Sequence, residues 1–450
     1  MRIHFIAIGG AVMHNLALEL QQLGHEVSGS DDEIFDPARS RLDQAGLLPD
    51  TLGWHPERIT ASIDQVILGM HARSDNPELA RAKELGLNIY SFPEYLYEHS
   101  RNKKRVVVAG SHGKTSTTAM IMHVLRHQGV DFDYLVGSQL QGFERMVRMS
   151  DAPLVILEGD EYLTSPLDPT PKFLHYHPHL AVITGISWDH INVFPTRELY
   201  NEQFQKFIDS MEPDAAVVWY AGDPVLQKIM EDCRMRNLPY EGIPSRVEAG
   251  KTIVNFEGRD YPLSIFGAHN LQNLNAALLT CRELGISEHE FLTAIGSFTG
   301  TAKRLECLHQ SERIHVYRDF AHAPSKLKAT VEAVRQQFPE RMLIAAYELH
   351  TFSSLSLEFL PDYTGCMNAA DIRMVLLDPH VFALKRLPVL PDPEVAATFS
   401  ARVFHNGNKL ASALSEAMQS SVKPVVVLLM SSGKFDDMDI AGLIEHEFNN

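Results

Sequence analysis

The chain is poor in cysteine, with only four in 450 residues. The four are scattered and form no C-x-x-C pair, so the sequence indicates neither a zinc site nor a disulfide framework. Long apolar runs are also missing. None approaches the ~20 residues of a membrane-spanning helix, and Met1 leads directly into a predicted strand instead of the apolar part of a signal peptide. We therefore expect a cytoplasmic protein with no membrane partner.

Positive charge is the second deficit. The chain has 40 Lys and Arg against 57 Asp and Glu, which gives a formal net charge of −17. Because nucleic acids are polyanions, this balance argues against them as the main partner, although it permits a local basic pocket for a phosphorylated substrate. The 450 residues, of which 45% are hydrophobic and 22% charged, are typical of a globular protein. At ~150 residues per domain, the length predicts about three domains.

The strongest chemical signal lies where an apolar strand, Val106–Ala109, meets a glycine-flanked turn, Gly110–Gly113, and a predicted helix, Lys114–Gln128. Strand, loop and helix in this order are typical of a phosphate-binding P-loop. In such a loop the backbone N–H groups and the positive end of the helix dipole face the anion. The sequence therefore predicts a phosphate site at this turn.

Two side chains of the loop have specific expected roles. Lys114 would reach the outer phosphates, and the hydroxyl of Thr115 would lie beside a magnesium ion. Val108 stands where the longer P-loop pattern has its first glycine, so an ordinary strand-to-helix turn is the competing interpretation. The motif consists of Gly110, Ser111, His112, Gly113, Lys114 and Thr115.

The first hundred residues predict a second nucleotide site. A strand at His4–Ile8 runs into Gly9 and Gly10, a helical pattern follows, and a strand at Glu26–Gly29 leads to Asp31. This is a βαβ opening with an acid where dinucleotide folds bind a ribose. The glycine pattern is incomplete for G-x-G-x-x-G, so a nucleotide diphosphate fits better than NAD.

A third strand of this region, Gln65–Leu68, leads to a polar loop that contains His71 and Arg73. Substrate binding and simple solvation are equal alternatives for these two side chains. With a further strand at Asn88–Ser91, the region predicts a small doubly wound sheet.

Two polar positions follow strands of the central region. Glu158 comes directly after the buried-type strand Leu154–Leu157, and an acid there, beside a P-loop, suits a magnesium ligand or a water-orienting group. Helix capping is the alternative for the neighbouring Asp160 or Glu161. His190 follows the next strand of the same sheet and is a candidate metal or phosphate ligand.

Asn270 and Asn273 lie three residues apart where a helix, Leu274–Leu284, begins. That spacing places them on one helix face. Capping explains one of the two amides, whereas a pair that faces the same way suits the edge of an adenine.

The last third of the chain alternates strands and helices, which predicts a second doubly wound α/β domain. Two polar turns follow strands there, Asp319–His322 and Met430–Lys434. The carboxyl ends of parallel strands are the usual ligand-facing edge of such a sheet.

Taken together, these motifs resemble the Mur ligase family, the ATP-dependent amide-forming enzymes of peptidoglycan assembly, over nearly the whole chain. Several short motifs in one fixed order are more specific than any one of them. The motifs are Gly9–Gly10 with Asp31, Gly110–Ser116, Glu158–Glu161, Asp189–His190, Gly267–Asn273, Lys303–Arg304 and Asp319–Pro324.

The resemblance implies three α/β domains. Residues 1–101 would form a Rossmann-like domain that binds a UDP-sugar, and residues 102–299 a P-loop domain that binds ATP. Residues 300–450 would form a doubly wound domain that completes the site for ATP and the amine substrate. ATP and Mg²⁺ are the expected cofactors.

The resemblance also assigns residues to these ligands. The expected catalytic residues are Lys114, Glu158, His190 and Arg304, and the expected magnesium ligands are Thr115, Glu158 and His190. The expected ATP site comprises Gly110, Ser111, His112, Gly113, Lys114, Thr115, Ser116, Asn270, Asn273, Arg304, Asp319 and His322. The expected UDP-sugar site comprises Gly9, Gly10, Asp31, His71 and Arg73.

The implied reaction joins the lactyl carboxylate of UDP-N-acetylmuramate to an α-amine through an acyl phosphate. In one branch of the family the amine is L-alanine, and in another it is the recycled tripeptide L-alanyl-γ-D-glutamyl-meso-diaminopimelate. The stretches Asp160–Phe173 and Met430–Phe435 look like the tripeptide branch, which we favour, whereas Glu348–His350 lacks the Arg that this branch tends to present.

Two other classes of function stay open. A P-loop kinase or plain NTPase would share Lys114 and Glu158 but has no use for a UDP-type first domain. A nucleotide-sugar sensor would bind without turnover and would not need Lys114, Glu158 and His190 together. The expected assembly is a monomer or a homodimer.

Overall fold

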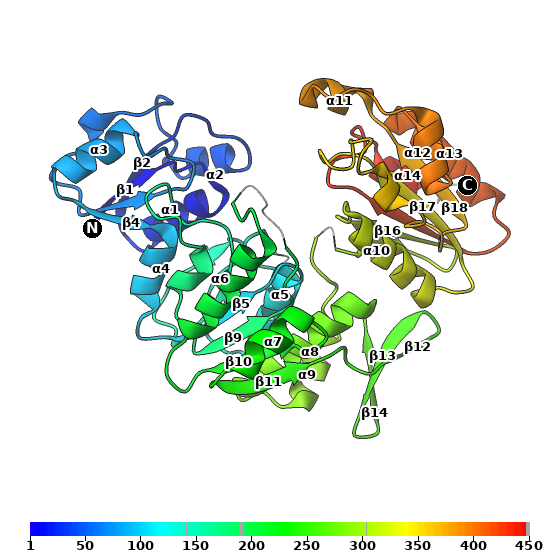
Figure 1. Cartoon of the computed structure of the whole chain (residues 1–450), viewed down its shortest axis with the longest axis horizontal. Coiled ribbons are helices and arrows are strands. Elements are labelled where there is room, and N and C mark those ends of the chain that lie inside the picture. Colours follow the sequence, from blue (N-terminus) through cyan, green and yellow to red (C-terminus); the bar gives the residue numbers. More distant parts are fainter. Residues whose placement is uncertain (141, 189–192, 303, 447–450) are drawn as a thin grey trace. The chain divides into compact units, whose positions relative to one another are not determined.

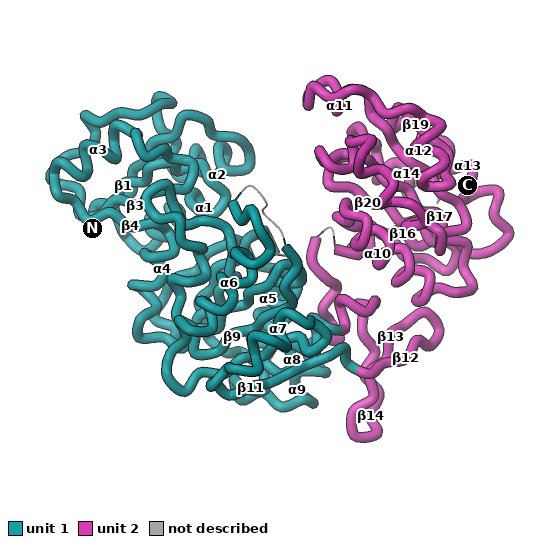
Figure 2. The backbone as a smooth tube through the Cα atoms, in the orientation of Figure 1, with its two compact units in different colours: residues 1–243, 272–295 teal, residues 244–271, 296–450 magenta. Residues whose placement is uncertain are grey.

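The computed structural model describes residues 1–140, 142–188, 193–302 and 304–446. The chain divides into two compact units (Figure 2). Unit 1 consists of Met1–Ile243 with Gln272–Ile295, and unit 2 of Pro244–Leu271 with Gly296–Asn450. Both units are built from strands alternating with helices, so the predicted α/β class is confirmed (Figure 1). The division at residues 101 and 299 stays a prediction.

The first hundred residues of unit 1 form a four-stranded parallel sheet in the order β2-β1-β3-β4. Strand β1 ends before the predicted Ile8, because Ala7 adopts a left-handed φ of 68°. The strands are β1 (Arg2–Ile6), β2 (Glu26–Ser30), β3 (Gln65–Leu68) and β4 (Asn88–Ser91). The helices are α1 (Ala11–Gln22), α2 (Ala38–Gln44), α3 (Pro77–Glu84) and α4 (Phe92–Ser100).

The rest of unit 1 is built on a seven-stranded sheet in the order β11-β10-β9-β5-β8-β6-β7, parallel except at the β7 edge. The strands are β5 (Lys104–Ala109), β6 (Asp133–Leu135), β7 (Val147–Arg148), β8 (Leu154–Glu158), β9 (Leu180–Ile183), β10 (Ala216–Tyr220) and β11 (Arg236–Tyr240). The helices are α5 (Lys114–His127), α6 (Arg197–Asp209), α7 (Pro224–Glu231) and α9 (Glu288–Ile295). Helix α8 (Ala268–Glu283) belongs to unit 2 up to Leu271 and to unit 1 from Gln272.

Strand β5 is the centre of this sheet. Its residues Val106–Ala109 are fully buried, which fits an apolar, β-branched run covered on both faces. Strand β5 pairs with β8 on one side and with β9 on the other. The chain fills the β8 side first, with β6, β7 and β8, and then crosses to β9, β10 and β11 on the other side. The carboxyl end of β5 is therefore the point where the strand order reverses, which is where open parallel sheets bind ligands.

The turn-rich sequence of Asn237–Ile265, with its short apolar stretches, predicts a β insert, but the structure divides this segment between two sheets. Its first strand, β11, pairs in parallel with β10 and belongs to the large sheet of unit 1. The remainder is a separate antiparallel sheet in unit 2. Its strands are β12 (Arg246–Glu248), β13 (Lys251–Phe256) and β14 (Arg259–Leu263).

Unit 2 also contains a six-stranded sheet in the order β15-β16-β20-β17-β18-β19. Its edge strand β15 runs antiparallel to β16 and was not predicted. The strands are β15 (Glu306–Gln310), β16 (Ile314–Asp319), β17 (Met342–Glu348), β18 (Ile372–Leu376), β19 (Arg402–Phe404) and β20 (Val425–Met430). The helices are α10 (Pro324–Gln337), α11 (Pro379–Lys385), α12 (Asp392–Phe399), α13 (Gly407–Ser420) and α14 (Ile440–His446). Within the described residues, no helix combines the length and apolar character needed to span a bilayer.

The side chain of Arg105 ties β5 to the end of the first hundred residues. It is 1% exposed, and its Nη1 donates to the carbonyl oxygens of Ser100 at 2.8 Å and Arg101 at 2.9 Å. Its Nε donates to the carbonyl oxygen of Tyr176 at 2.9 Å, and its Nη2 pairs with Glu212. One buried guanidinium thus satisfies backbone acceptors from two segments far apart in sequence.

We expect Arg105→Met to lower the free energy of unfolding by about 3–5 kcal/mol, because it leaves several buried carbonyls and Glu212 without their donor. Urea denaturation measures the loss. Arg2→Met is the matched control, since Arg2 and its partner Glu26 have side chains 53% and 71% exposed, and such a pair contributes less than about 1 kcal/mol. Equal urea midpoints for the two variants would contradict the role of Arg105.

Candidate active site

The predicted P-loop is formed by the end of β5, a tight turn and the first turn of α5. Gly110 and Gly113 have φ angles of 123° and 82°, which only glycine adopts readily. A Cβ at Gly110 would collide with Thr184, and a Cβ at Gly113 with the amide of Asn273. Helix α5 begins with no side-chain cap and no acidic residue in its first turn. Its N-terminal N–H groups are therefore suited to an anion.

Lys114 is held by two acceptors at this turn. Its Nζ donates to the carbonyl oxygen of Gly110 at 2.5 Å and to Oε2 of Glu161 at 2.7 Å. The Glu161 residue is only 1% exposed, so this is an ion pair largely shielded from water. The lysine is therefore held beside the loop by two protein acceptors.

Thr115 and Glu158, two of the predicted magnesium ligands, are hydrogen-bonded to each other. The hydroxyl of Thr115 donates to Oε1 of Glu158 at 2.8 Å, and the N–H of Gly137 donates to Oε2 at 2.9 Å. Burial raises the pKa of Glu158, while these two hydrogen bonds and the charge of Lys114 lower it. A hydroxyl and a carboxylate this close offer the hard oxygen ligands that Mg²⁺ prefers.

The other predicted residues of the loop have different surroundings. Ser111 Oγ accepts the N–H of Ser187 at 2.8 Å and lies 2.8 Å from the hydroxyl of Tyr200. His112 is exposed and Ser116 is buried. His190 lies outside the described residues.

The second predicted site lies at the glycine turn after β1. The N–H of Gly9 donates to Oδ2 of Asp31 at 2.7 Å, and burial raises the pKa of Asp31. Gly10 is the N-cap of α1, which has neither a side-chain cap nor an acid in its first turn. This helix end is therefore also suited to an anion.

His71 and Arg73 follow β3 and are both exposed. Arg73 makes an ion pair with Asp75 at 3.4 Å, and the two side chains are 86% and 73% exposed. For His71 and Arg73, substrate binding and solvation therefore stay equal alternatives.

The two asparagines predicted at a helix start lie inside the first turns of α8, which begins at Ala268. Asn270 Nδ2 donates to the carbonyl oxygen of Phe266 at 3.0 Å. Asn273 is buried and lies against Gly113 of the P-loop. Asn273 is therefore part of the P-loop surroundings in unit 1.

In unit 2, Asp319 at the end of β16 organises its own turn. Its carboxylate accepts the N–H groups of Leu305 and Ala321, each at 2.7 Å, and burial raises its pKa. The guanidinium of Arg304 lies 5.3 Å from the ring centre of Phe320. His322 Nδ1 lies 2.9 Å from the carbonyl oxygen of Phe320.

Two residues that contact the P-loop, Glu161 and Tyr200, were not predicted to do so. Neither Asp160 nor Glu161 caps a helix: Asp160 accepts the N–H of Tyr162 at 3.2 Å, and Glu161 binds Lys114. Tyr200 of α6 donates to Oε1 of Glu161 at 3.2 Å. The motif Glu158–Glu161 could have indicated a role for Glu161 beside the P-loop. Nothing in the sequence of α6 distinguishes Tyr200 from a tyrosine of the core.

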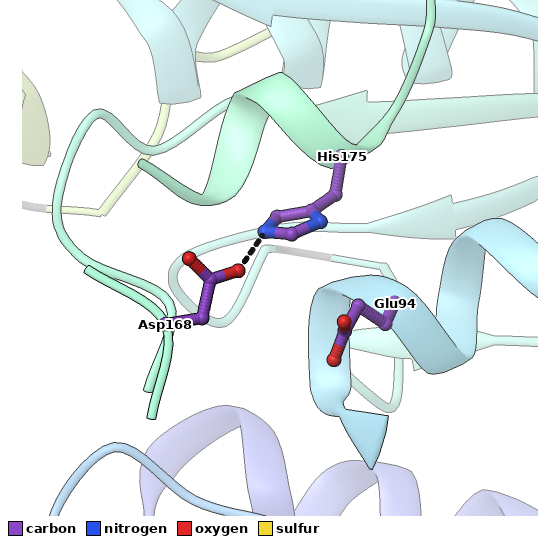
Figure 3. A group of neighbouring side chains, drawn as sticks. All are labelled: Glu94, Asp168 and His175. Atoms are coloured by element: carbon purple, nitrogen blue, oxygen red, sulfur yellow. Dashed lines mark ion pairs between the residues drawn. The ribbon is translucent and has the colours of Figure 1, made fainter. Parts of the chain in front are cut away.

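A separate group of ionisable side chains lies where α4 comes close to the segment before β9 (Figure 3). Glu94, Asp168 and His175 bring ligand atoms within 4.8 Å of one another. Glu94 already accepts the N–H and the hydroxyl of Ser91, both at 2.7 Å, in the capping box of α4. Asp168 pairs with Nε2 of His175 at 3.0 Å. Glu94 thus serves the helix cap and Asp168 pairs with His175, so we assign no metal to this group.

The fold and the site define a P-loop α/β enzyme, and two family models match the chain. Residues 2–104 match the model described as Mur ligase family, catalytic domain, and residues 108–281 match the Mur ligase middle domain. The chain therefore belongs to the Mur ligase family, whose members are ATP-dependent ligases that form amide bonds.

Relatives support the same conclusion. The chain is 29% identical to UDP-N-acetylmuramate--L-alanine ligase of Syntrophomonas wolfei, over 79% of this chain and 78% of the relative. It is 28% identical to UDP-N-acetylmuramate--L-alanyl-gamma-D-glutamyl-meso-2,6-diaminoheptandioate ligase of Haemophilus influenzae, over 74% and 76%. The crystal structure of UDP-N-acetylmuramate-alanine ligase from Thermotoga maritima has the same three-domain fold, with 20% identity, a TM-score of 0.70 and full coverage of both chains.

We expect Gly113→Ala to weaken both folding and ATP binding. A left-handed alanine costs about 1–2 kcal/mol, and the added methyl would also displace Asn273. Gly258→Ala is the matched control, because Gly258 has a similar φ of 81° with nothing within 4 Å of an added Cβ. Urea unfolding and calorimetry with ATP measure the two effects. A loss of stability no greater than that of Gly258→Ala would contradict the close contact at the P-loop.

Proposed function

We propose that the protein joins the lactyl carboxylate of UDP-N-acetylmuramate to the α-amine of L-alanyl-γ-D-glutamyl-meso-diaminopimelate, with hydrolysis of ATP to ADP and phosphate. The observation that carries the proposal is the P-loop of unit 1, where Thr115 is bound to Glu158 at the end of β8 and Lys114 to Glu161 in the loop that follows. The anion-suited turn at Gly9 and Gly10 in the same unit gives the UDP-sugar a site of its own.

In this proposal the γ-phosphate of ATP lies beside Lys114. The lactyl carboxylate attacks the γ-phosphorus and ADP leaves, which yields an acyl phosphate. The amine then attacks the acyl carbon, loses a proton and expels phosphate. Both steps build negative charge on oxygens, and a cation fixed in a shielded site stabilises such charge far better than one in water.

Magnesium fits the pair formed by Thr115 and Glu158. Both side chains present oxygen, and the hydrogen bond between them holds the two ligands 2.8 Å apart. A bound Mg²⁺ would neutralise charge on the phosphate oxygens. From the sequence pattern alone, His190 is proposed as a further ligand.

We assign the remaining predicted residues to the two nucleotides. The backbone of Gly110–Gly113 and the side chain of Ser116 lie at the triphosphate end of the ATP site, and Asn273 lies beside the loop. Asn270, Arg304, Asp319 and His322 are assigned to ATP by their place in the family motifs. Gly9, Gly10, Asp31, His71 and Arg73 are assigned to the UDP-sugar.

L-Alanine is the second candidate for the amine. It is favoured by the name of the Syntrophomonas relative, whereas the tripeptide is favoured by the name of the Haemophilus relative and by the stretch Asp160–Phe173. The two amines share the α-amine of an L-alanyl residue, so the difference must lie in what binds the rest of the tripeptide.

Phosphate release with ATP and UDP-N-acetylmuramate decides between these amines. We expect the tripeptide to support a higher kcat/KM than L-alanine at equal concentration. A higher kcat/KM for L-alanine would show that L-alanine, and not the tripeptide, is the amine substrate. ATP turnover that needs neither UDP-N-acetylmuramate nor an amine would overturn the proposed ligase activity.

We expect Lys114→Met to lower kcat by about 10²–10³-fold, the usual loss when one group that stabilises developing charge is removed. The thermal midpoint should also fall, because the buried carboxylate of Glu161 loses the partner that balances its charge, so rates are compared at a temperature where both variants stay folded. Lys206→Met on α6, whose lysine side chain is 51% exposed, controls for the loss of a positive charge. Comparable rates for the two variants would refute the role of Lys114.

A further inference from the structure

Tyr200 occupies an unusual position on α6. The residue is fully buried, yet its hydroxyl lies 2.8 Å from Ser111 Oγ and 3.2 Å from Oε1 of Glu161. One phenol thus touches both the P-loop and the carboxylate that holds the P-loop lysine. A buried tyrosine usually satisfies its hydroxyl with one nearby acceptor, so this double contact calls for an explanation.

The ring of Tyr200 is fixed by its aromatic neighbours. The ring centres of Phe194 and Phe204 each lie 5.4 Å from that of Tyr200, and both contacts are edge-to-face. Such contacts leave a buried ring little freedom to tilt. The hydroxyl is therefore presented at a set position and cannot simply follow Glu161 when that side chain moves.

The hydrogen bonds have a defined direction. Glu161, paired with the ammonium of Lys114, can only accept, so the Tyr200 proton points to Oε1. The Ser111 hydroxyl then donates to the phenol oxygen, and Ser111 Oγ in turn accepts the N–H of Ser187. The result is a relay of donors that begins at the backbone and ends on the carboxylate.

This relay bears on how Lys114 meets phosphate. In the structure Oε2 of Glu161 accepts from Lys114 while Oε1 accepts from Tyr200. To bind phosphate oxygens, the ammonium must exchange part of its interaction with Glu161 for them. A second donor on the same carboxylate offsets some of its negative charge, weakens its hold on the lysine and stays with it after the lysine turns away.

We propose that Tyr200 is a positioning residue for ATP. Through its hydrogen bonds to Glu161 and Ser111, its phenol determines how readily Lys114 exchanges its ion pair with Glu161 for the phosphates of ATP. The inference rests on the proposed ATP site, and it concerns binding of ATP more than the chemical steps. Tyr200 touches neither substrate in this scheme and acts only through its two neighbours.

The test is Tyr200→Phe in the full-length chain. We expect the Kd for a non-hydrolysable ATP analogue, measured by calorimetry, and the KM for ATP to rise about tenfold, as for the loss of one hydrogen bond to a charged group. The KM for UDP-N-acetylmuramate should stay within about twofold. Unchanged ATP affinity, or an equal rise for both substrates, would overturn the proposal.

Tyr95→Phe is the matched control. Tyr95 is also a buried tyrosine of unit 1, 2% exposed, and among the described residues its hydroxyl has no hydrogen-bond partner. Its removal should leave the ATP affinity unchanged. If Tyr95→Phe weakened ATP binding as much as Tyr200→Phe, the effect would be one of general packing, and the proposal would fall.

The route through Glu161 has its own test. In a Glu161→Gln background the neutral amide no longer holds the ammonium as an ion pair, so adding Tyr200→Phe should change the Kd by less than about twofold. A persistent tenfold effect would exclude this route. Because calorimetry reads ATP binding alone, a chain that binds the analogue but ligates neither amine would contradict the proposed function and leave the role of Tyr200 measurable.

Discussion

The ion pair between Lys114 and Glu161 is the interaction on which the site of unit 1 depends. A lysine at the start of a helix has no partner within the helix, and water would leave its long side chain free to sample many positions. Glu161, only 1% exposed, fixes the ammonium beside the loop. The charge is thereby held near the helix end that attracts phosphate, before any anion arrives.

Ionisable side chains also hold the backbone at three other places in the described chain. Asp31 binds the N–H of Gly9, Asp319 binds the N–H groups of Leu305 and Ala321, and Arg105 binds the carbonyls of Ser100 and Arg101. In each case an ionisable side chain satisfies backbone groups in a turn or at the end of a helix. Buried charges are costly unless they are paired in this way, so each turn is held in one conformation.

Much of the fold follows from local pattern. The β-branched run of β5, the glycine turn and the helix Lys114–His127 could be predicted because burial, φ requirements and helix periodicity all act within about 20 residues. Edge elements were harder. Strand β15 carries the mixed sequence Glu-Cys-Leu-His-Gln and owes its extended form to pairing with β16. The strand β11 reads like the start of a β insert, but it joins the large sheet.

By itself, the sequence determined the α/β class and the family, because strand ends and loop motifs are encoded by neighbouring residues. Only the tertiary structure decided that Glu161 holds Lys114, that Asn273 lies against Gly113 and that the hydroxyl of Tyr200 reaches the P-loop from α6. These contacts join residues 47, 160 and 89 positions apart. Such separations are set by how the strands are ordered and how the helices cover them, which no local pattern records.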